Sequence, residues 1–286
     1  MQGMIYLALA ILFSSGVALS MKGGNRPSVN LWQFLAVNYV VCTTGLIAWG
    51  AWKTLGGNSL FIWLLGIFTG LMYVLCLWLF NKAIQAQGLA LSTTLMRLSA
   101  AIPTLGSLVF FNETTGFLQS LGIGLAFMCL PLASREPLHF VRSGPPFWQG
   151  LVWGLLLFVT YGITDFVFKI QAELEPQADP KAFMATIFGT ALIFTLPRLK
   201  GLAPPGPACL FWGTALGTTN VLATWFWILA LSHLPGAIAY PTLGLGVITV
   251  TTLISLVFWK ETLRPANYLF LAMACVAVFL IHVGAA

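Results

Sequence analysis

Ten runs of apolar residues, each close to the length of a helix that crosses a bilayer, follow one another along this 286-residue chain. The hydrocarbon core of a bilayer is about 30 Å thick, and a helix rising ~1.5 Å per residue crosses it in about 20 residues. Unbroken runs of this kind are typical of membrane helices, whereas membrane barrel strands alternate apolar and polar residues. The runs lie near residues 3–21, 31–52, 60–81, 88–111, 115–133, 147–169, 181–197, 208–231, 235–258 and 265–284. The sequence therefore predicts an all-α, polytopic membrane protein with ten transmembrane helices.

Composition excludes the soluble classes of protein. Hydrophobic residues make up 59% of the chain and charged residues only 7%, against about 25% charged residues in a typical soluble domain. These values exclude a soluble enzyme, a disordered chain and a secreted disulfide scaffold. The basic residues are scattered singly through the loops, so the net charge of +6 does not indicate a nucleic-acid partner. We expect the chain to lie in the lipid bilayer of the cell (inner) membrane.

Residue types that hold metals, cofactors or nucleotides form no recognisable motif. None of the five cysteines belongs to a C-x-x-C pair, and the three histidines are far apart. The sequence lacks the G-x-x-x-x-G-K-[ST] loop that binds ATP, and it also lacks H-E-x-x-H and G-x-S-x-G. We therefore expect no metal, no cofactor and no enzymatic activity, and no pumping driven by ATP hydrolysis within this chain.

The two halves of the chain are related in sequence. Residues 88–114 align with residues 236–262 without a gap, and 11 of the 27 positions are identical. Polar matches are the informative ones, because apolar matches are common between any two membrane helices. They are Thr94 with Thr242, Ser107 with Ser255, and Glu113 with Glu261, each pair 148 residues apart. We predict an internal duplication, with one five-helix repeat in residues 1–134 and the other in residues 147–286.

The odd number of helices in each repeat determines the topology. After five crossings the second repeat must enter the membrane in the opposite sense, which makes the pair an inverted repeat. Inverted repeats build transporters with the substrate site near the midplane, because the two halves exchange roles during alternating access. A passive channel has no need for such duplication and is the alternative from another functional class.

Arg97 is the clearest case of a charged residue inside a predicted membrane helix. A charge near the bilayer centre costs from about 3 to above 10 kcal/mol, so it is expected to face a partner or a wet cavity. Arg97 lies well inside the run 88–111, and helical spacing places Thr93 and Thr104 on the same face. We interpret Arg97 and Thr93 as substrate-binding residues, with Arg97 attracting a carboxylate or phosphate. The alternatives are a structural Arg bound to backbone carbonyls, or one that snorkels to the membrane surface.

Asp165 is the one acid well inside a run. Tyr161, Asp165 and Lys169 are spaced by four residues and therefore share a helix face. In the functional interpretation, Asp165 either carries a coupling proton or binds a substrate amine, with Tyr161 beside it. In the structural interpretation, Asp165 forms an ion pair with Lys169 or Arg97 that only holds the helix in place.

Other polar residues inside the runs are less specific candidates. Such residues more often join helices by hydrogen bonds than bind ligands. Asn220 follows the close-packing pattern Gly213-x-x-x-Gly217 by about one turn, so it could face a cavity between helices. The residues added to the substrate-binding set are Asn38, Tyr73, Asn220 and Tyr240.

Two prolines lie within the duplicated runs. Pro103 is in the run 88–111 and Pro241 is in the run 235–258. Proline removes a helix hydrogen bond and can kink or locally open a helix. We expect these two helices either to carry static kinks or to be the helices that move.

Several of these segments carry a resemblance to a known family. They are Met96-Arg97-Leu-Ser99-Ala-Ala-Ile102-Pro103, Phe111-Asn-Glu113-Thr, Gly162-Ile-Thr-Asp165 with Lys169, Leu216-Gly217-Thr-Thr-Asn220, Tyr240-Pro241-Thr-Leu-Gly244 and Trp259-Lys-Glu261-Thr. Over nearly its whole length the chain resembles the drug/metabolite transporter superfamily, in its ten-helix EamA-type branch. Related sequences often carry Lys at the position of Arg97, but only Arg can bind a carboxylate through two parallel hydrogen bonds. The resemblance implies a transporter and leaves its substrate open, because the family moves amino acids, sugars, nucleotide derivatives and drugs.

The distribution of basic residues bears on orientation. Loops after the odd-numbered runs carry Lys22, Arg26, Lys82, Arg135, Arg142, Arg198, Lys200, Lys260 and Arg264, whereas the other loops and span ends carry Lys53, Lys169 and Lys181. By the positive-inside rule the first set is cytoplasmic, which places both termini outside. The resemblance implies the opposite, with both termini inside.

Together these features predict a secondary transporter of a small polar or zwitterionic, amino-acid-like metabolite, acting by alternating access in the direction of export. The alternatives are a sugar or drug carrier of the same fold and a passive channel. The expected partners are a small-molecule substrate, the lipid bilayer and, if Asp165 is a coupling site, protons. We expect a monomer or a weak dimer.

Overall fold

The computed structural model describes residues 1–24, 26–87, 89–130, 147–259 and 265–283. Within these ranges, the side chains at positions 81, 85, 87, 89–91, 93, 94, 147, 148, 255–259 and 265–267 are outside the description. Most of the predicted boundary between the repeats, residues 134–147, lies outside the described residues. Gly88, Glu261 and the side chain of Thr93 lie outside them as well.

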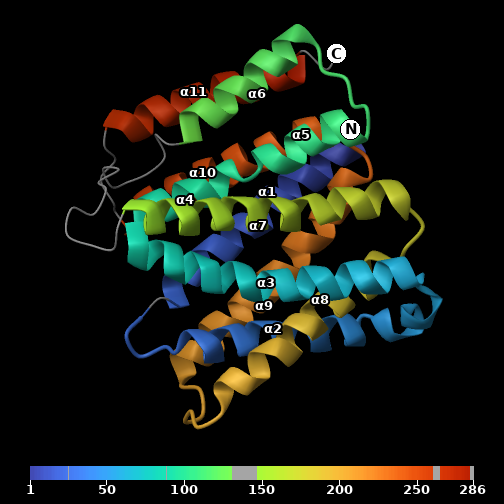
Figure 1. Ribbon diagram of the computed structural model, residues 1–286, viewed down its shortest axis with the longest axis vertical. Helices are drawn as coiled ribbons and strands as arrows, with labels where there is room; N and C mark the ends of the chain where they lie inside the picture. The colour runs from blue at the N-terminus through green and yellow to red at the C-terminus, as the bar shows by residue number, and fades with distance from the viewer. Residues whose placement is uncertain (25, 88, 131–146, 260–264, 284–286) are drawn as a thin grey trace. The chain divides into compact units, whose positions relative to one another are not determined.

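The described part of the chain is helical throughout (Figure 1). The α-helices are α1 (Gln2–Gly24), α2 (Leu31–Ala48), α3 (Leu60–Gln87), α4 (Leu89–Leu98), α5 (Ala101–Phe110), α6 (Phe117–Cys129), α7 (Phe147–Leu174), α8 (Pro180–Thr195), α9 (Pro207–Leu231), α10 (Gly236–Trp259) and α11 (Pro265–Val283). Short 3-10 turns are η1 (Ala51–Lys53), η2 (Leu55–Gly57) and η4 (Leu196–Leu199). No strand occurs in the described ranges, which confirms the all-α prediction for them.

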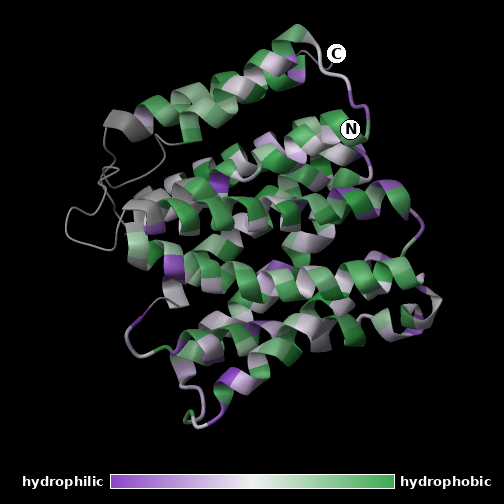
Figure 2. Ribbon diagram, in the orientation of Figure 1, coloured by the Kyte–Doolittle hydropathy of each residue, from purple (hydrophilic) through white to green (hydrophobic). Residues whose placement is uncertain are grey.

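Seven of the described helices are long and apolar enough to cross a membrane: α1, α2, α3, α7, α8, α9 and α10. Shorter apolar helices lie in residues 95–110, 117–129 and 268–283. Figure 2 shows hydrophobic residues along the helices, with hydrophilic residues mostly at helix ends and in the turns. The described residues therefore have the pattern of a multi-pass membrane protein, as predicted.

Each predicted run contains helix, but the run 88–111 contains two. α4 ends at Leu98 and α5 begins at Ala101, so a two-residue turn interrupts the run just before Pro103, where a kink or a local opening is expected. Pro103 explains the interruption, because it has no N–H for the carbonyl four residues earlier and its ring clashes with that carbonyl. The Ser99 carbonyl instead accepts the Ile102 N–H at 2.9 Å. Arg97 and Thr104 therefore lie on either side of this turn, Arg97 in α4 and Thr104 in α5.

Pro241 has a milder effect than Pro103. It lies inside α10, which continues through it from Gly236 to Trp259. Pro241 is the sixth residue of α10, so it removes the hydrogen bond to the Ala237 carbonyl without ending the helix. The structure thus shows one interrupted and one continuous helix where the sequence predicted two similar kinks.

The chain divides into two compact units. Unit 1 comprises Met1–Val74 and Ile170–His233, and unit 2 comprises Leu75–Lys169 and Leu234–Ala286. Each unit therefore contains helices from both predicted repeats, and α3 and α7 contribute residues to both units.

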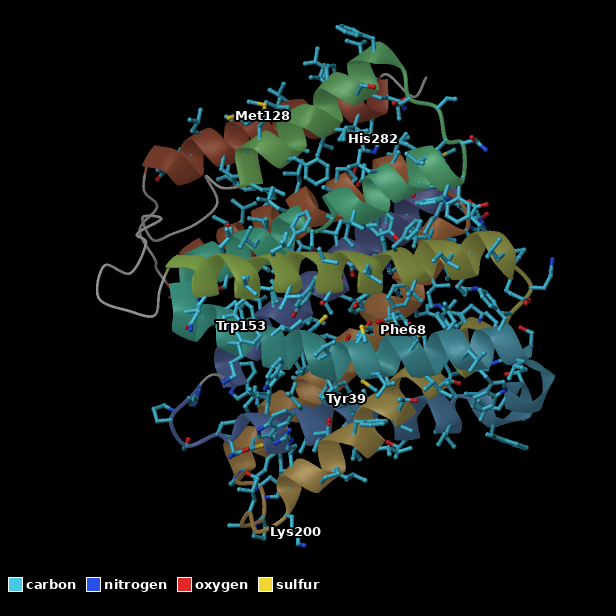
Figure 3. All side chains as sticks on the ribbon, in the orientation of Figure 1. Tyr39, Phe68, Met128, Trp153, Lys200 and His282 are labelled. Carbon is cyan, nitrogen blue, oxygen red and sulfur yellow. The ribbon has the colours of Figure 1, made fainter. Side chains whose placement is uncertain are left out.

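Unit 1 is built around close helix contacts. α9 packs along α1 and α2, and α2 also packs against α8 (Figure 1). Glycines allow the approach, since a Cβ added to Gly217 would lie 2.7 Å from the Cβ of Val41. Tyr39 of α2, labelled in Figure 3, lies with its ring centroid 6.4 Å from that of Phe188 on α8.

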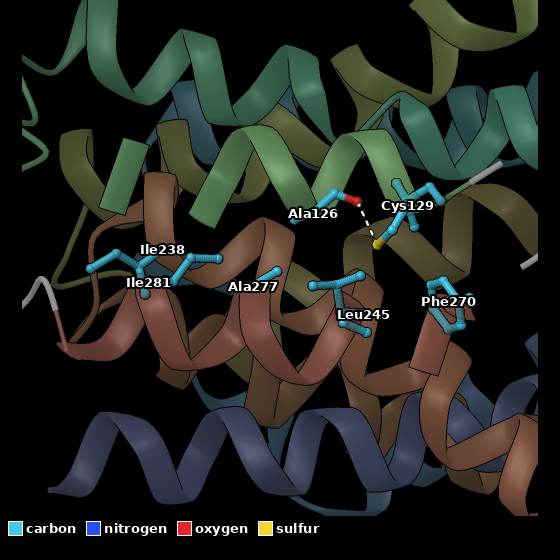
Figure 4. Close-up of a cluster of buried hydrophobic side chains, with 9 residues drawn as sticks. Ala126, Cys129, Ile238, Leu245, Phe270, Ala277 and Ile281 are labelled. Atoms are coloured by element: carbon cyan, nitrogen blue, oxygen red, sulfur yellow. Dashed lines mark hydrogen bonds between the residues drawn. The ribbon is translucent and has the colours of Figure 1, made fainter. Parts of the chain in front are cut away.

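Unit 2 contains two apolar clusters. The first joins α6 and α11, which lie side by side, to α10 (Figure 4). Its buried members are Ala126, Cys129, Leu130, Ile238, Leu245, Phe270, Ala274, Ala277 and Ile281. The second joins the end of α3 to α4 and α7, with Leu79, Ala83 and Leu157 buried and Met96, Trp153 and Tyr161 packed against them. Trp153 (Figure 3) meets Trp78 edge to face at a centroid distance of 5.6 Å. This second cluster brings α4 next to α7 and so positions the polar residues of both.

Candidate functional site

Arg97 of α4 and Asp165 of α7 come together in unit 2. Arg97 lies in the last turn of α4, where the negative end of the helix dipole favours a cation. Asp165 and Tyr161, which are one turn apart on α7, both lie within electrostatic range of the Arg97 guanidinium. All three side chains are half-buried. The structure therefore brings together three of the residues that the sequence singled out.

The opposite charges of Arg97 and Asp165 are close but do not close an ion pair. Among the described residues, no hydrogen bond or ion pair occupies the guanidinium of Arg97 or the carboxylate of Asp165. Neither group is among the fully buried polar atoms that lack a partner, and both residues keep part of their surface exposed. A cation and an anion that are both accessible can each receive a separate group of one ligand.

Lys169, one turn after Asp165 on α7, has a different partner. Its Nζ lies 2.7 Å from Oε1 of Glu113, and the Lys169 side chain is 2% exposed. The structural alternative in which Lys169 neutralises Asp165 therefore does not hold in this structure. The acid of α7 remains available for another role because the nearest lysine along the helix is bound elsewhere.

Tyr240 of α10 reaches the same stretch of α7. Its hydroxyl donates a hydrogen bond of 2.8 Å to the backbone carbonyl of Asp165, and its side chain is buried. Tyr240 thus joins α10 to the backbone that carries Asp165. Its role as a direct substrate ligand stays a prediction, and the contact observed here is with the helix.

Asn38 and Asn220 form an interhelical pair in unit 1. The Asn220 side-chain nitrogen donates to Oδ1 of Asn38 at 3.3 Å, which joins α9 to α2. Asn38 is 1% exposed, and its Oδ1 also lies 3.6 Å from the thiol of Cys42. This arrangement matches the joining role that is common for amides in membrane helices.

The remaining predicted residues are placed less specifically. Tyr73 of α3 is half-buried in unit 1, with its ring centroid 6.1 Å from that of Phe188. Thr93 lies in α4, one turn before Arg97, and its side chain is outside the described residues. The substrate-binding set is therefore divided: Arg97, Tyr161, Asp165 and Tyr240 are close together in unit 2, and Asn38, Asn220 and Tyr73 belong to unit 1.

The sequence did not assign a role to Glu113. Its carboxylate binds Lys169 and also accepts the backbone N–H groups of Gly236 and Ala237, both at 2.8 Å. The signals in the sequence were its match with Glu261 and its place in the segment Phe111-Asn-Glu113-Thr, which carries part of the resemblance. No group of three or more His, Cys, Asp or Glu side chains that could hold a metal ion occurs among the described residues.

Comparisons with known proteins identify the fold and name no activity. No family model matches the chain. An uncharacterized protein of Haemophilus influenzae is 24% identical over 289 residues, covering 96% of this chain and 97% of that protein. A solved structure, described only as the crystal structure of a protein, matches with a TM-score of 0.80 and 15% identity over 98% of this chain and 96% of that one. At this identity the structural match shows a shared fold alone.

Proposed function

We propose that this protein is a secondary transporter of a small zwitterionic, amino-acid-like metabolite, which it exports across the cell membrane by alternating access. The observation that carries the proposal is the arrangement of Arg97 and Asp165. Both are charged and half-buried in an apolar membrane chain, and neither is neutralised by a direct bond to the other. Such groups are costly in a membrane, and their cost is offset when a ligand or water fills the space between them.

The charges fit the two ends of a zwitterion. The guanidinium of Arg97 presents a planar set of donors that suits a carboxylate, and the Asp165 carboxylate suits an ammonium group. Tyr161 adds a ring and a hydroxyl beside the guanidinium. A neutral sugar or an apolar drug would leave both charges without a partner, which is why the zwitterion is preferred over those carriers.

The interruption between α4 and α5 supports a transport site. Substrate sites of secondary transporters are typically formed by discontinuous helices whose ends point at charged groups. Arg97 is the second-last residue of α4, immediately before the interruption. The charge and the break in the helix are thus adjacent, as such a site requires.

We extend the proposal to ten membrane helices in two inverted repeats. Seven described helices are long enough to cross, and the three shorter apolar segments, residues 95–110, 117–129 and 268–283, supply the other crossings. The sequence match of residues 88–114 with 236–262 supports the duplication. Alternating access by two equivalent halves would need this organisation. The resemblance to EamA-type transporters supports it as well.

Transport by purified protein in proteoliposomes tests the proposal. A thermal-shift screen against zwitterionic, anionic, cationic and neutral metabolites first identifies ligands, because binding to the folded state raises the melting temperature. The selected metabolite should then show saturable uptake and counterflow when unlabelled metabolite is loaded inside. Flux that never saturates and shows no counterflow would indicate a channel. Selection of neutral ligands alone would indicate a sugar or drug carrier.

A further inference from the structure

The turn after α5 directs Glu113 back toward the helices of unit 2. α5 ends at Phe110, and Asn112 has a φ of 51°, in the left-handed region that Asn tolerates better than most residues. The Glu113 N–H then bonds back to the carbonyl of Ser107 at 3.4 Å. This geometry fixes the position of the Glu113 side chain at the C-terminal end of α5.

Both oxygens of the Glu113 carboxylate are bound. Oε1 lies 2.7 Å from Nζ of Lys169 and accepts the Gly236 N–H at 2.8 Å, and Oε2 accepts the Ala237 N–H at 2.8 Å. Gly236 and Ala237 begin α10, so their N–H groups have no partner within that helix. Glu113 therefore caps α10 from a distant part of the sequence and neutralises a buried lysine of α7. We call Glu113, Lys169, Gly236 and Ala237 the Glu113 junction.

The Glu113 junction is connected to the Arg97–Asp165 site through two helices. On α7, Lys169 follows Asp165 by one turn, and on α10, Tyr240 follows Gly236 by one turn. Tyr240 in turn bonds the carbonyl of Asp165 at 2.8 Å. α7 and α10 are thus joined at two successive turns, one at the junction and one at the backbone of the site. Separation of the two helices at the junction would therefore also move the turn of α7 that bears Asp165.

The start of α10 is closely packed at the junction. A Cβ added to Gly236 would overlap the hydroxyl of Ser107 on α5, so the start of α10 lies directly against α5. Ser107 is fully buried, and its hydroxyl has no hydrogen-bond partner among the described residues. Such a packed contact is either closed or separated, because tightly packed surfaces do not deform continuously.

We propose that the Glu113 junction is a gate of the transport cycle. While the gate is closed, the Glu113 carboxylate holds α5, α7 and α10 together where α5 ends and α10 begins. Release of the carboxylate opens the site at that end. The proposal rests on the transporter function. Glu113 would be a positioning residue that never touches substrate. Glu113 binds two backbone N–H groups of α10 in addition to Lys169, whereas Lys169 contributes only the ion pair to the junction. Substitution of Glu113 should therefore open the site more than substitution of Lys169.

Alkylation of native cysteines by N-ethylmaleimide tests this without any substrate. Cys76 is 3% exposed, and its thiol lies 3.6 Å from the Thr164 hydroxyl, next to Asp165, so it reports opening of the site. Cys42 and Cys129 are both fully buried elsewhere and report general unfolding. The intact protein is alkylated in lipid nanodiscs and then digested, and mass spectrometry of the peptides measures the alkylation of each cysteine separately.

Glu113→Gln should raise the alkylation rate of Cys76 about tenfold or more, because loss of a hydrogen bond to a charged group shifts an opening equilibrium by that order. Lys169→Gln should raise it less. Cys42 and Cys129 should remain slow in both variants. Glu173→Gln removes an exposed carboxylate from the same helix and should leave Cys76 unchanged. In proteoliposomes Glu113→Gln should lower the maximal transport rate while the ligand-induced thermal shift stays at the wild-type value.

Three results would overturn the gate. The first is a Cys76 rate in Glu113→Gln equal to that in Glu173→Gln. The second is a joint rise in the alkylation rates of Cys42, Cys76 and Cys129, which means general destabilisation. In that case the same rates are measured in Glu113→Asp, which keeps the charge, and the gate is overturned when this variant also fails to raise the Cys76 rate selectively. The third is a Lys169→Gln effect equal to or larger than that of Glu113→Gln, which means a simple ion pair. Selective opening of Cys76 without any transport activity would sustain the junction and contradict the proposed function instead.

Discussion

At the scale of single residues, Arg97 is the first to test. Arg97→Ala should weaken ligand affinity about 10- to 100-fold, since a hydrogen bond to a charged group contributes about 1.5–3 kcal/mol. Arg97→Lys should retain part of the affinity, because it keeps the charge and loses the paired geometry. Thermal-shift titration of the ligand found by screening, followed by proteoliposome flux, measures both effects.

The control for Arg97 is Arg198→Ala. Arg198 is an exposed arginine of η4 that lies over the ring of Trp32, 5.3 Å from its centroid, and it belongs to unit 1, whereas Arg97 belongs to unit 2. It should bind and transport like wild type. A purely structural Arg97 would give another pattern, with loss of folded protein in Arg97→Ala, because charged partners would be left unpaired. Folded Arg97→Ala with normal transport would remove the site assignment.

Asp165 separates amine binding from proton coupling. Asp165→Asn keeps the shape of the side chain and removes its charge. If Asp165 binds the ammonium group of the substrate, as we propose, affinity should fall about 10- to 100-fold while transport keeps its pH dependence. If it carries the coupling proton, substrate should still bind and a proton gradient should no longer drive transport. Substrate-driven pH change inside proteoliposomes, measured for wild type and Asp165→Asn, decides between the two.

The cost of burying charge is what made Arg97 and Asp165 predictable. A charged residue in the middle of an apolar run needs a partner or water whatever the fold, so the sequence alone marks it. Glu113 carried no such mark, because it lies at the end of its run, where charges ordinarily reach the membrane surface. Its partners Gly236 and Ala237 are 123 and 124 residues away, and no spacing rule connects them.

At the scale of helices, periodicity and run length predicted where the helices lie but not where they are interrupted. The two matching runs share Thr, Leu, Ser and Glu positions, yet their prolines differ: Pro103 aligns with Thr251, and Pro241 aligns with Thr93. Either proline removes the N–H that would bond the carbonyl four residues earlier, which is that of Ser99 for Pro103 and that of Ala237 for Pro241. The turn before Pro103 and the continuous helix through Pro241 differ for a reason that the sequence does not explain.

The contact between α2 and α9 gives a prediction for packing. A Cβ at Gly217 would lie 2.7 Å from the Cβ of Val41 and 2.8 Å from the backbone oxygen of Asn38. Gly217→Ala should therefore destabilise the protein by about 1–3 kcal/mol through overpacking. Gly45→Ala, on the exposed side of α2 with nothing within 4 Å, is the matched control and should be neutral or slightly stabilising. Unfolding in detergent, followed by circular dichroism, measures both; equal stability of the two variants would contradict the close contact.

At the scale of the whole molecule, the compact units do not coincide with the predicted repeats. Unit 1 combines α1 and α2 with α8 and α9, and unit 2 combines α4, α5 and α6 with α10 and α11. Comparison within the sequence groups segments by matching residues, whereas packing groups segments by which apolar surfaces fit together. Each unit thus contains helices from both predicted repeats, and no pattern within one half of the sequence reveals this.

Topology provides the last prediction. Ten crossings place both termini on one side and the segment 135–146, after five crossings, on the other. Seven crossings by the long helices alone would place the termini on opposite sides, with three crossings before 135–146 and four after it.

Fusions of green fluorescent protein, which fluoresces in the cytoplasm, and alkaline phosphatase, which is active outside, separate these cases when placed at the C-terminus and within 135–146. Because Arg135 and Arg142 favour the cytoplasm, we expect fluorescence from the loop fusion and phosphatase activity from the C-terminal fusion. An N-terminal tag reached by an impermeant reagent only from the outside completes the test. The reverse sides for all three reporters would contradict the charge argument and keep the inverted repeats, whereas termini on opposite sides would rule those repeats out.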